Sequence, residues 1–599
     1  MKVTQTPQSI ILTPEFENEV KRLNLFFPGK EEKTFPRTPS GQRLLNAIIK
    51  DFQHTYSYSY GYLSALVQEV PLLPLPDLSK YGFNFQPLPH QINALQNMIT
   101  FNQHGVFLEM GLGKTFASIW RIIHSIHTEG GLRFLVVCPK RVIPTWINEV
   151  KKFCGKENPH FTTIVLDDKY TVEARANLLK TAQFATTPVV FVTNYESFRH
   201  DNEVIKAFEE ANALWDMAIL DESVKIRYTN TKVQRGLIQI MRLFKKRYIL
   251  SGLPAPQSLS DYIGQFAFMH SVMFGYTQRN KFESDYAYRN SYTHRIDAWR
   301  DVQWIHERIH EFATVITKKD AGINLPEKMY VTRECEMTSA QKKFYNDLAV
   351  RFIASVEEMG PIKAGSVEAI HVLARLTRLS QASNGWACGV PDLSAVKDVE
   401  WFDAGYNEED QEPIPTLPPI LFDPNPKLEM LLEVLDEISP IVSHDDSSIE
   451  KPPPFVVVAR YTHEILEIKK RLEGEGYKVA VIRGGLTTAK QIEIQERFDL
   501  LEYDGLIINI SAGKYGLNLQ KANTLIYFSC DYNWDSRGQS EERVHRLGQT
   551  NPVTIVDLVS SGTIDQEIIE RLKEKKSVSD LILKHPRAVL PEEYELLER

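Results

Sequence analysis

The chain has 599 residues, too many for a single hydrophobic core, and its length suggests roughly three to four domains. Its 43% hydrophobic and 24% charged residues are typical of a globular protein and exclude a disordered or fibrous one. The sequence has no apolar run near the ~20 residues of a membrane span, no signal-peptide core and no C-x-x-C pair among its cysteines. A net charge of −8 argues against bulk coating of nucleic acid but is compatible with a local basic groove.

Residues 1–80 are predicted to form a small accessory module. The segment 40–50 has the apolar spacing of a short amphipathic helix, and a proline-rich connector at 71–76 ends the module. Such a module either packs its aromatic residues internally or stacks them on nucleic-acid bases. These aromatic residues recur at strand period, at Tyr56, Tyr58, Tyr60 and Tyr62.

Residues 81–270 alternate between strand-like runs and helical patterns. The runs are almost continuously apolar, as expected when helices cover both faces of a parallel sheet. The segment is therefore predicted to be a doubly wound α/β domain. Its strands are expected at 105–108, 133–138, 162–166, 188–193, 216–220 and 247–251.

A glycine-rich turn follows the first of these strands, in the stretch Phe107-Leu-Glu-Met-Gly-Leu-Gly-Lys-Thr115. A turn of this kind between strand and helix directs backbone N–H groups and the helix dipole at one point, which suits a phosphate group. Lys114 is expected to reach the β- and γ-phosphates and Thr115 to hold Mg²⁺. Leu108 departs from the general G-x-x-x-x-G-K-[ST] pattern, which has glycine there. The predicted nucleotide-binding residues are Met110, Gly111, Leu112, Gly113, Lys114 and Thr115.

Two carboxylates end the predicted strand 216–220, in Trp215-Asp-Met-Ala-Ile-Leu-Asp-Glu-Ser223. They should lie at the carboxyl edge of the sheet, beside the glycine-rich turn. Asp221 is predicted to hold Mg²⁺ through water, and Glu222 to orient or deprotonate the attacking water.

The rest of the chain is predicted to hold helical protrusions and a second α/β domain. Residues 271–425 have long amphipathic stretches at 300–318 and 338–358, followed by an acidic, proline-rich linker. Residues 426–560 alternate again, and residues 561–599 form a C-terminal helical tail. Strands of the second domain are expected at 455–459, 478–482, 505–510, 524–528 and 553–557.

An arginine pair lies near the end of this second domain, in Gln539-Ser-Glu-Glu-Arg-Val-His-Arg-Leu-Gly-Gln549. Arg543 and Arg546 are three residues apart, so on a helix they would share one face. Two guanidinium groups presented together suit the transition-state charge on a γ-phosphate.

In this order the segments resemble the Swi/Snf-type ATPases of helicase superfamily two, in the compact form of phage or bacterial members. The resemblance covers roughly residues 85–575, and this family writes its phosphate loop as Glu109-Met-Gly-Leu-Gly-Lys-Thr115, which accounts for Leu108. It implies two RecA-like parallel-sheet lobes with helical insertions between them. The stretches that carry it, besides the phosphate loop, are Pro87-Leu-Pro-His-Gln91, Val136-Val-Cys-Pro-Lys140 with Trp146, Asp221-Glu222, Leu250-Ser-Gly-Leu-Pro254, Gly513-Lys-Tyr-Gly-Leu-Asn-Leu519, Trp534 and Arg543-Val-His-Arg-Leu-Gly-Gln-Thr550.

The resemblance also implies roles for single residues. Gln91 would contact the adenine, and Ser251 and Gly252 would couple the γ-phosphate state to lobe movement. From the second lobe, Gln539 and both arginines would close onto the nucleotide. The nucleic-acid backbone would be contacted by Lys140, Thr193, Asn194, Tyr195, Gly513, Lys514 and Asn518.

One position departs from the family pattern. The usual D-E-A-H or D-E-G-H becomes Asp221-Glu-Ser-Val224, so the histidine that often connects the hydrolytic residues to the Ser-Gly turn is absent. Val224 cannot make its hydrogen bond, and either Ser223 or Lys225 could carry the coupling instead.

The predicted function is therefore an ATP-dependent translocase on duplex or branched DNA, with ATP and Mg²⁺ as cofactors and DNA as partner. A strand-separating helicase is the alternative, and a nucleotide-gated DNA-binding scaffold without hydrolysis is a third possibility. The expected location is the cytoplasm of a bacterial or phage-infected cell, or the nucleus of a eukaryote, with no membrane association.

Overall fold

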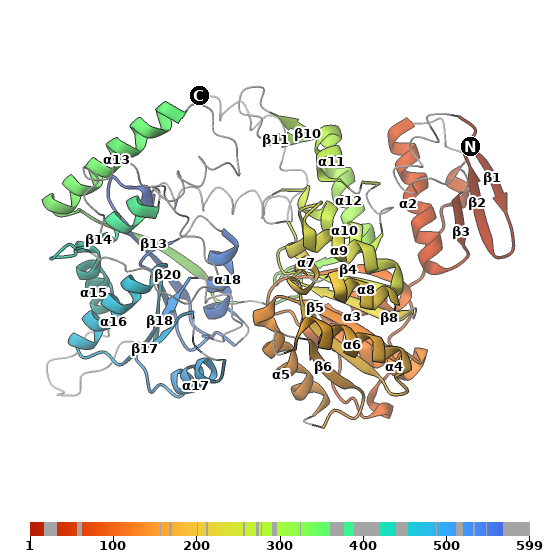
Figure 1. Ribbon diagram of the computed structural model, residues 1–599, viewed down its shortest axis with the longest axis horizontal. Coiled ribbons are helices and arrows are strands. Elements are labelled where there is room, and N and C mark those ends of the chain that lie inside the picture. Colours follow the sequence, from red (N-terminus) through yellow and green to blue (C-terminus); the bar gives the residue numbers. More distant parts are fainter. Residues whose placement is uncertain are drawn as a thin grey trace. The chain divides into compact units, whose positions relative to one another are not determined.

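A computed structural model of the chain contains two compact units (Figure 1). The first unit lies within residues 1–324 and the second within residues 325–576. No helix in the described part of the chain is long and apolar enough to cross a membrane. The structure describes residues 1–16, 19, 33–56, 63–155, 157–166, 170–200, 202–210, 214–255, 258–270, 275–276, 278–289, 296–323, 325–359, 377–387, 420–438, 453–484, 486, 488–510, 519–530, 534–546, 548–566 and 569.

The first unit is built on a seven-stranded parallel sheet in the order β12-β4-β9-β8-β5-β7-β6. Because β9 lies between β4 and β8, the segments that follow these three strands leave the same edge of the sheet side by side. The strands are β4 (Gln103–Leu108), β5 (Arg133–Cys138), β6 (Thr162–Leu166), β7 (Val189–Asn194), β8 (Trp215–Asp221), β9 (Phe244–Leu250) and β12 (Ala313–Ile316).

Helices cover both faces of this sheet, which explains its continuous apolar strands (Figure 1). Along β5, Val136 packs into the core beneath α3, α4 and α5, whereas its neighbours Leu135 and Val137 pack into the core beneath α6, α8, α9, α10 and α12. The helices are α3 (Pro89–Thr100), α4 (Lys114–Glu129), α5 (Ile143–Cys154), α6 (Val172–Thr181), α7 (Ser197–His200), α8 (Asn202–Glu210), α9 (Lys232–Ile240), α10 (Asp261–Met269), α11 (Arg279–Tyr286) and α12 (Val302–Phe312).

The second unit repeats this architecture with a six-stranded parallel sheet in the order β13-β20-β19-β16-β18-β17. Two buried apolar clusters again lie on opposite faces, one against α13, α17 and α18 and the other against α15 and α16. Its elements are β13 (Lys328–Cys335), α13 (Ser339–Met359), α15 (Pro426–Ile438), β16 (Phe455–Ala459), α16 (Thr462–Gly474), β17 (Val479–Ile482), α17 (Thr488–Asp499), β18 (Gly505–Asn509), β19 (Thr524–Tyr527), α18 (Trp534–Val544) and β20 (Val553–Ser560). The fold class predicted from the sequence, two RecA-like α/β lobes, is confirmed.

Smaller antiparallel elements accompany the two sheets. At the N-terminus, β1, β2 and β3 form a three-stranded sheet that shares an apolar core with α2. The other small pairs are β10 with β11 and β14 with β15. Their bounds are β1 (Lys2–Gln5), β2 (Ser9–Thr13), β3 (Lys33–Pro36), α2 (Pro39–Tyr56), β10 (Ala287–Arg289), β11 (Ile296–Trp299), β14 (Trp386–Ala387) and β15 (Ile420–Leu421).

Two local predictions need correction. Tyr56 was expected on a strand, but it is the last residue of α2, which is longer than predicted; Tyr58, Tyr60 and Tyr62 lie outside the described residues. The helix expected over 300–318 ends at Phe312, where the chain turns into β12 and pairs with β4. β4 would otherwise be the edge of the sheet, and this pairing satisfies its backbone groups.

Candidate active site

The glycine-rich turn between β4 and α4 depends on conformations that favour glycine. Gly111 has φ +89° and Gly113, the residue that caps α4, has φ +83°. A Cβ atom built on Gly113 would lie 2.2 Å from Nε2 of Gln91, so a side chain there would displace the Gln91 amide from the turn. The backbone N–H groups that begin α4 therefore follow a tight turn, as a phosphate-binding loop requires.

Gln91, on α3, braces this turn. It is only 3% exposed; its Nε2 donates to the carbonyl oxygen of Leu112 at 3.0 Å, and its Oε1 accepts from the backbone N–H of Leu88 at 2.9 Å. His90 Nε2 lies 3.1 Å from the same Leu112 oxygen. The structure thus shows Gln91 in contact with the loop, and its contact with adenine stays a prediction.

The end of β9 lies against the same loop. Lys114 Nζ donates to the carbonyl oxygen of Leu108 at 3.0 Å, and a Cβ on Gly252 would lie 3.1 Å from that Nζ and 2.8 Å from Cγ of Met110. Ser251 is fully buried and its backbone N–H donates to the carbonyl oxygen of Val106. The structure therefore brings together Lys114 and Gly252, which the sequence placed in one site.

Asp221 ends β8 as a buried carboxylate. Its Oδ2 accepts from Nε1 of Trp146 at 2.7 Å and its Oδ1 accepts from the backbone N–H of Glu222 at 3.0 Å. Burial raises the pKa of Asp221, while the positive charge of Lys114 and the Trp146 hydrogen bond oppose that rise. The Tyr195 hydroxyl donates to the backbone carbonyl of Asp221 at 2.8 Å, which fixes the strand end from β7.

The donor set fits a hard cation such as Mg²⁺. Thr115 supplies a hydroxyl at the start of α4, and Asp221 supplies a carboxylate whose oxygens each keep lone-pair capacity beyond the bonds just described. A buried carboxylate with a raised pKa is stabilised in its charged form by a nearby cation. Among described residues, no group of three or more His, Cys, Asp or Glu side chains could hold a metal ion by itself.

Glu222 has a strained backbone. Its φ of 52° and ψ of 51° place it in the left-handed region, which costs a non-glycine residue about 1–3 kcal/mol. The next residue, Ser223, is fully buried and donates from its hydroxyl to Gln265 Oε1 at 2.7 Å, whereas Lys225 is exposed. Of the two alternatives for coupling, the buried contact belongs to Ser223.

The residues predicted to contact DNA have different surroundings. Lys140 is exposed at the carboxyl end of β5. Thr193, Asn194 and Tyr195 are each 2% exposed and bond inside the unit: Thr193 Oγ1 donates to the Leu166 carbonyl, and Asn194 Oδ1 accepts from the Ser197 N–H. Their side chains are therefore engaged within the unit, and the predicted DNA contacts would have to come from their main-chain atoms. Gly513, Lys514 and Asn518 lie outside the described residues.

In the second unit, α18 carries Gln539 and Arg543, both partly buried. Arg546 lies two residues beyond the end of this helix at Val544, so the helix that was predicted to present both arginines ends before the second one. The carbonyl oxygen of Arg543 instead accepts from the N–H of Leu519 at 2.9 Å. That bond joins Leu519, the residue that follows the predicted DNA-contacting segment, to the arginine segment.

Comparison with known protein families matches both units. The SNF2-related domain matches residues 90–385, and the helicase conserved C-terminal domain matches residues 427–548. The chain belongs to the SNF2-related family. Both matches agree with the parallel sheets and the phosphate loop described above.

Individual members of the SNF2-related family are distant from this chain. The probable ATP-dependent DNA helicase CHR12 of Arabidopsis thaliana is 25% identical over 91% of this chain and 44% of that protein. The DNA repair and recombination protein RAD54-like of Drosophila erecta is 26% identical over 79% of this chain and 59% of that protein. A structure of the Sulfolobus solfataricus SWI2/SNF2 ATPase core in complex with dsDNA is 21% identical, covers 84% of this chain and 94% of that chain, and has a TM-score of 0.36. The chain spans about half the length of the curated relatives it matches.

Sequence reasoning missed a buried network that supports α18 in this SNF2-related chain. Glu541 accepts from Lys328 Nζ at 3.0 Å and from the Tyr330 hydroxyl at 2.8 Å, while Arg537 forms a bidentate pair with Asp557. In the sequence, the charged residues of α18 have the pattern of a solvent-exposed helix face. The sheet register, which places β13 beside β20, is what buries them.

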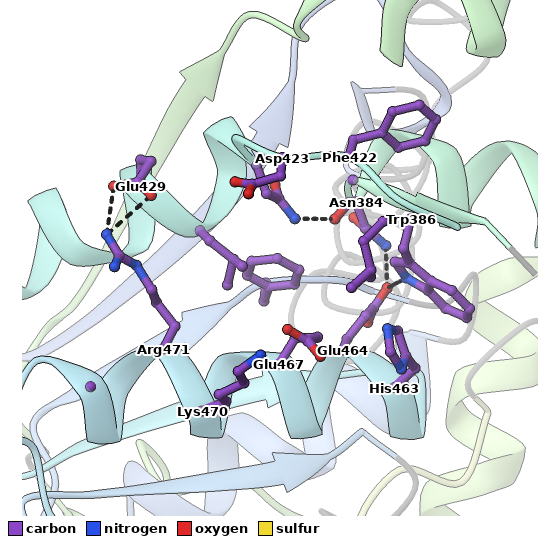
Figure 2. Close-up of a pocket in the computed structure, with 16 residues that line it drawn as sticks. Asn384, Trp386, Phe422, Asp423, Glu429, His463, Glu464, Glu467, Lys470 and Arg471 are labelled. Carbon is purple, nitrogen blue, oxygen red and sulfur yellow. Dashed lines mark hydrogen bonds and ion pairs between the residues drawn. The ribbon is translucent and has the colours of Figure 1, made fainter. Parts of the chain in front are cut away.

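A pocket in the second unit lies away from the residues predicted to bind the nucleotide. It has a volume of about 400 Å³ and lies between β14, α15 and α16 (Figure 2). Glu464 accepts there from Asn384 Nδ2 at 2.7 Å, from Trp386 Nε1 at 3.0 Å and from Ser529 Oγ at 2.6 Å. None of the predicted site residues lines this pocket, and its central carboxylate is satisfied by the protein itself. Its contacts anchor the segment that precedes β14 to the second unit.

Proposed function

We propose that this chain hydrolyses ATP when bound to DNA and uses the hydrolysis to move along duplex or branched DNA. One observation carries the proposal. At one sheet edge, Lys114 lies against the Ser251-Gly252 turn, and the buried Asp221 is near enough to Lys114 for that charge to oppose the rise of its pKa. Glu222 follows directly, in a constrained backbone conformation.

These residues divide the chemistry of phosphoryl transfer. Lys114 and the N–H groups at the start of α4 would bind the β- and γ-phosphates, while Thr115 and Asp221 would hold Mg²⁺, which neutralises phosphate charge. Glu222 would accept a proton from, or orient, the attacking water. Arg543 and Arg546 would supply positive charge to the γ-phosphate in the transition state.

DNA as partner is supported by family membership and by the names of relatives, which include DNA repair and recombination proteins. Contacts from Lys140, the segment Thr193–Tyr195 and the loop containing Gly513, Lys514 and Asn518 would fall mainly on phosphates. Stepping would then be largely independent of DNA sequence and would weaken with salt.

ATP hydrolysis should be measured without DNA and with single-stranded, linear duplex, forked and four-way-junction DNA. We expect stimulation by at least one duplex-containing substrate, and loss of turnover in Lys114→Ala and Glu222→Gln with folding intact. Absence of stimulation by every DNA would refute the proposal. Unchanged turnover in both variants would refute the site assignment.

Translocation and strand separation can be told apart on matched substrates. A translocase on duplex DNA displaces a third strand annealed in the major groove, whereas a helicase also separates a plain fork. We expect ATP-dependent displacement of the third strand without fork separation. Fork separation would favour the alternative of a strand-separating helicase.

A further inference from the structure

Gln265 is a fully buried amide within the apolar helix α10. Its Oε1 accepts from the Ser223 hydroxyl at 2.7 Å, and its Nε2 donates to the carbonyl oxygens of Pro254 at 2.6 Å and Asp261 at 2.8 Å. Both N–H groups and the carbonyl of this side chain are therefore used. A buried amide without such partners would be costly, so the three bonds hold the side chain in one orientation.

These hydrogen bonds form a bridge from Ser223 through Gln265 to Pro254. The Ser223 end of the bridge constrains the backbone beside the hydrolytic residues. Ser223 follows Glu222, whose left-handed backbone is unfavourable for a residue with a side chain. A strained residue keeps such a conformation only when its neighbours impose it. The bond from Ser223 to Gln265 is a buried constraint of this kind, placed one residue after Glu222.

The other end holds the turn that contacts the phosphate loop. Pro254 ends the stretch that begins with Ser251 and Gly252, and Gly252 lies against Lys114 and Met110. A movement of this turn relative to Lys114 would therefore displace Gln265 through its bond to Pro254, and Ser223 through its bond to Gln265. The bridge connects the phosphate loop and the carboxylate pair by a second route besides the sheet.

The backbone of α10 is fixed on both sides of Gln265. A Cβ on Gly264 would lie 2.2 Å from the carbonyl oxygen of Ile226 and 2.6 Å from that of Arg227, so the helix packs directly on the turn after Glu222. On the opposite side, the rings of Tyr262 and Phe266 pack at 5.8 Å and 6.0 Å from the ring of Phe107, on β4. Gln265 thus sits on a helix clamped between the two halves of the site.

We propose that Gln265 is a positioning residue that ties Ser223, and hence the backbone of Glu222, to the Ser251–Pro254 turn. Gln265 would connect the hydrolytic residues to the Ser251–Pro254 turn, which Val224 cannot do. This role rests on the proposed ATPase function. Its contribution is to the geometry of the water-activating group and not to ATP binding. The sequence signal for it is a single amide in an otherwise apolar run, Tyr262-Ile-Gly-Gln-Phe-Ala-Phe-Met269.

The test compares full-length variants by steady-state ATPase kinetics with the DNA that stimulates the wild type. We expect Gln265→Leu and Ser223→Ala each to lower kcat about 100-fold, the loss that ~1 Å of misplacement causes, while KM for ATP stays within about twofold. The double variant should be no slower than the slower single variant, because both remove the same connection. Gln265→Glu keeps an acceptor for Ser223 but faces the Pro254 carbonyl with a carboxylate, so it should be as slow as Gln265→Leu.

Ser260→Ala is the matched control. Ser260 lies just before α10, is equally buried, and donates to Glu283 Oε1 at the same 2.7 Å; its other described side-chain partner is the hydroxyl of Ser258, outside the site. It should lower the melting temperature as much as Ser223→Ala and leave kcat unchanged. Equal kcat in Ser223→Ala and Ser260→Ala, or additive losses in the double variant, would overturn the proposal. A wild type without DNA-stimulated ATPase activity would instead overturn the proposed function.

Discussion

The two carboxylates that end β8 differ in their surroundings, although they are adjacent in sequence. Asp221 is 4% exposed and bonded on both oxygens, and burial raises its pKa. Glu222 is half-buried. Environments that differ in this way favour different roles. The difference supports the division in which Asp221 holds the cation and Glu222 handles the water.

Trp146 should tune the pH dependence of the reaction. Trp146→Phe keeps an aromatic ring but removes the N–H that donates to Asp221, so the already raised pKa of Asp221 should rise further. A hydrogen bond to a charged group contributes ~1.5–3 kcal/mol and one pKa unit corresponds to about 1.4 kcal/mol. Because the ionised carboxylate binds the cation, the acid limb of kcat/KM should move about one pH unit higher, as a pH–rate profile would show.

Trp215→Phe is the control for the loss of ring volume. Trp215 is fully buried at the start of the same strand, and its Nε1 has no hydrogen-bond partner in the described part of the chain. The change should cost stability without moving the acid limb. If both variants shift the profile equally, the Trp146 hydrogen bond does not set the pKa.

For single residues, the sequence predicts those that belong to a motif with fixed spacing, such as the phosphate-binding loop. Lys114, Asp221 and Gly252 meet in the structure because each ends or follows a neighbouring strand. Bonds between side chains distant in sequence could not be predicted in this way. Thr193 and Gln265 are both buried by tertiary packing, and their side chains bond to Leu166 and Ser223, which are distant from them in sequence.

Among the elements, α18 is held by charges rather than by apolar contacts alone. Arg537, Glu541 and Asp557 are each less than 5% exposed, and the Arg537 guanidinium donates to both carboxylates. Lys328 and Tyr330, on β13, complete the network. The helix that carries Arg543 is therefore tied to the first strand of its own unit.

Replacing Glu541 should destabilise the second unit in a pH-dependent way. The charges of Lys328 and Arg537 and their hydrogen bonds outweigh burial and lower the pKa of Glu541 below 4.5. A depressed pKa contributes stability above the unfolded value, and that stability is lost as pH falls through the folded value. Glu541→Gln should cost about 3 kcal/mol at neutral pH, and the difference from wild type in urea unfolding should shrink below about pH 4.5.

Glu542→Gln provides the comparison at the next position. The Glu542 carboxylate lies 3.8 Å from the same Lys328 and its side chain is more exposed, so its loss should cost less than ~1 kcal/mol. Equal effects of the two substitutions, or a Glu541→Gln effect that does not change with pH, would contradict the assignment.

Strands buried on both faces were predictable, whereas the two edge strands that follow the first α/β segment were not. β5 and β16 are continuous apolar runs, and their predicted bounds agree with the structure. β13 stands at the end of the described strand order, beside β20, and keeps exposed residues along its length, so it lacks that pattern. β12 directly continues an amphipathic helix and is too short to be recognised as a strand.

At the scale of the whole molecule, the N-terminal module is part of the first unit. The Arg43 guanidinium, on α2, lies 3.7 Å from the ring centroid of Phe101 and donates to the Gln103 carbonyl and to Nδ1 of His104. Because arginine only donates, His104 must carry its proton on Nε2, which lies 2.8 Å from Thr314 Oγ1. The module is thus connected through buried polar groups to β4, the strand that leads into the phosphate loop.

The two units contribute separate parts of the proposed chemistry, which predicts a distinctive response to ATP. In a Glu222→Gln background, which prevents turnover, ATP should slow hydrogen exchange at the start of α4 and also in α18, because Arg543 would bind the same nucleotide. Adding Arg543→Ala should abolish the protection in α18 and leave that of α4 largely intact. Lys114→Ala should abolish both, since the first unit supplies most of the phosphate contacts. Persistent protection of α18 after removal of Arg543, measured by exchange mass spectrometry, would show that ATP acts on the second unit without this arginine, and Arg546 would be the next residue to remove.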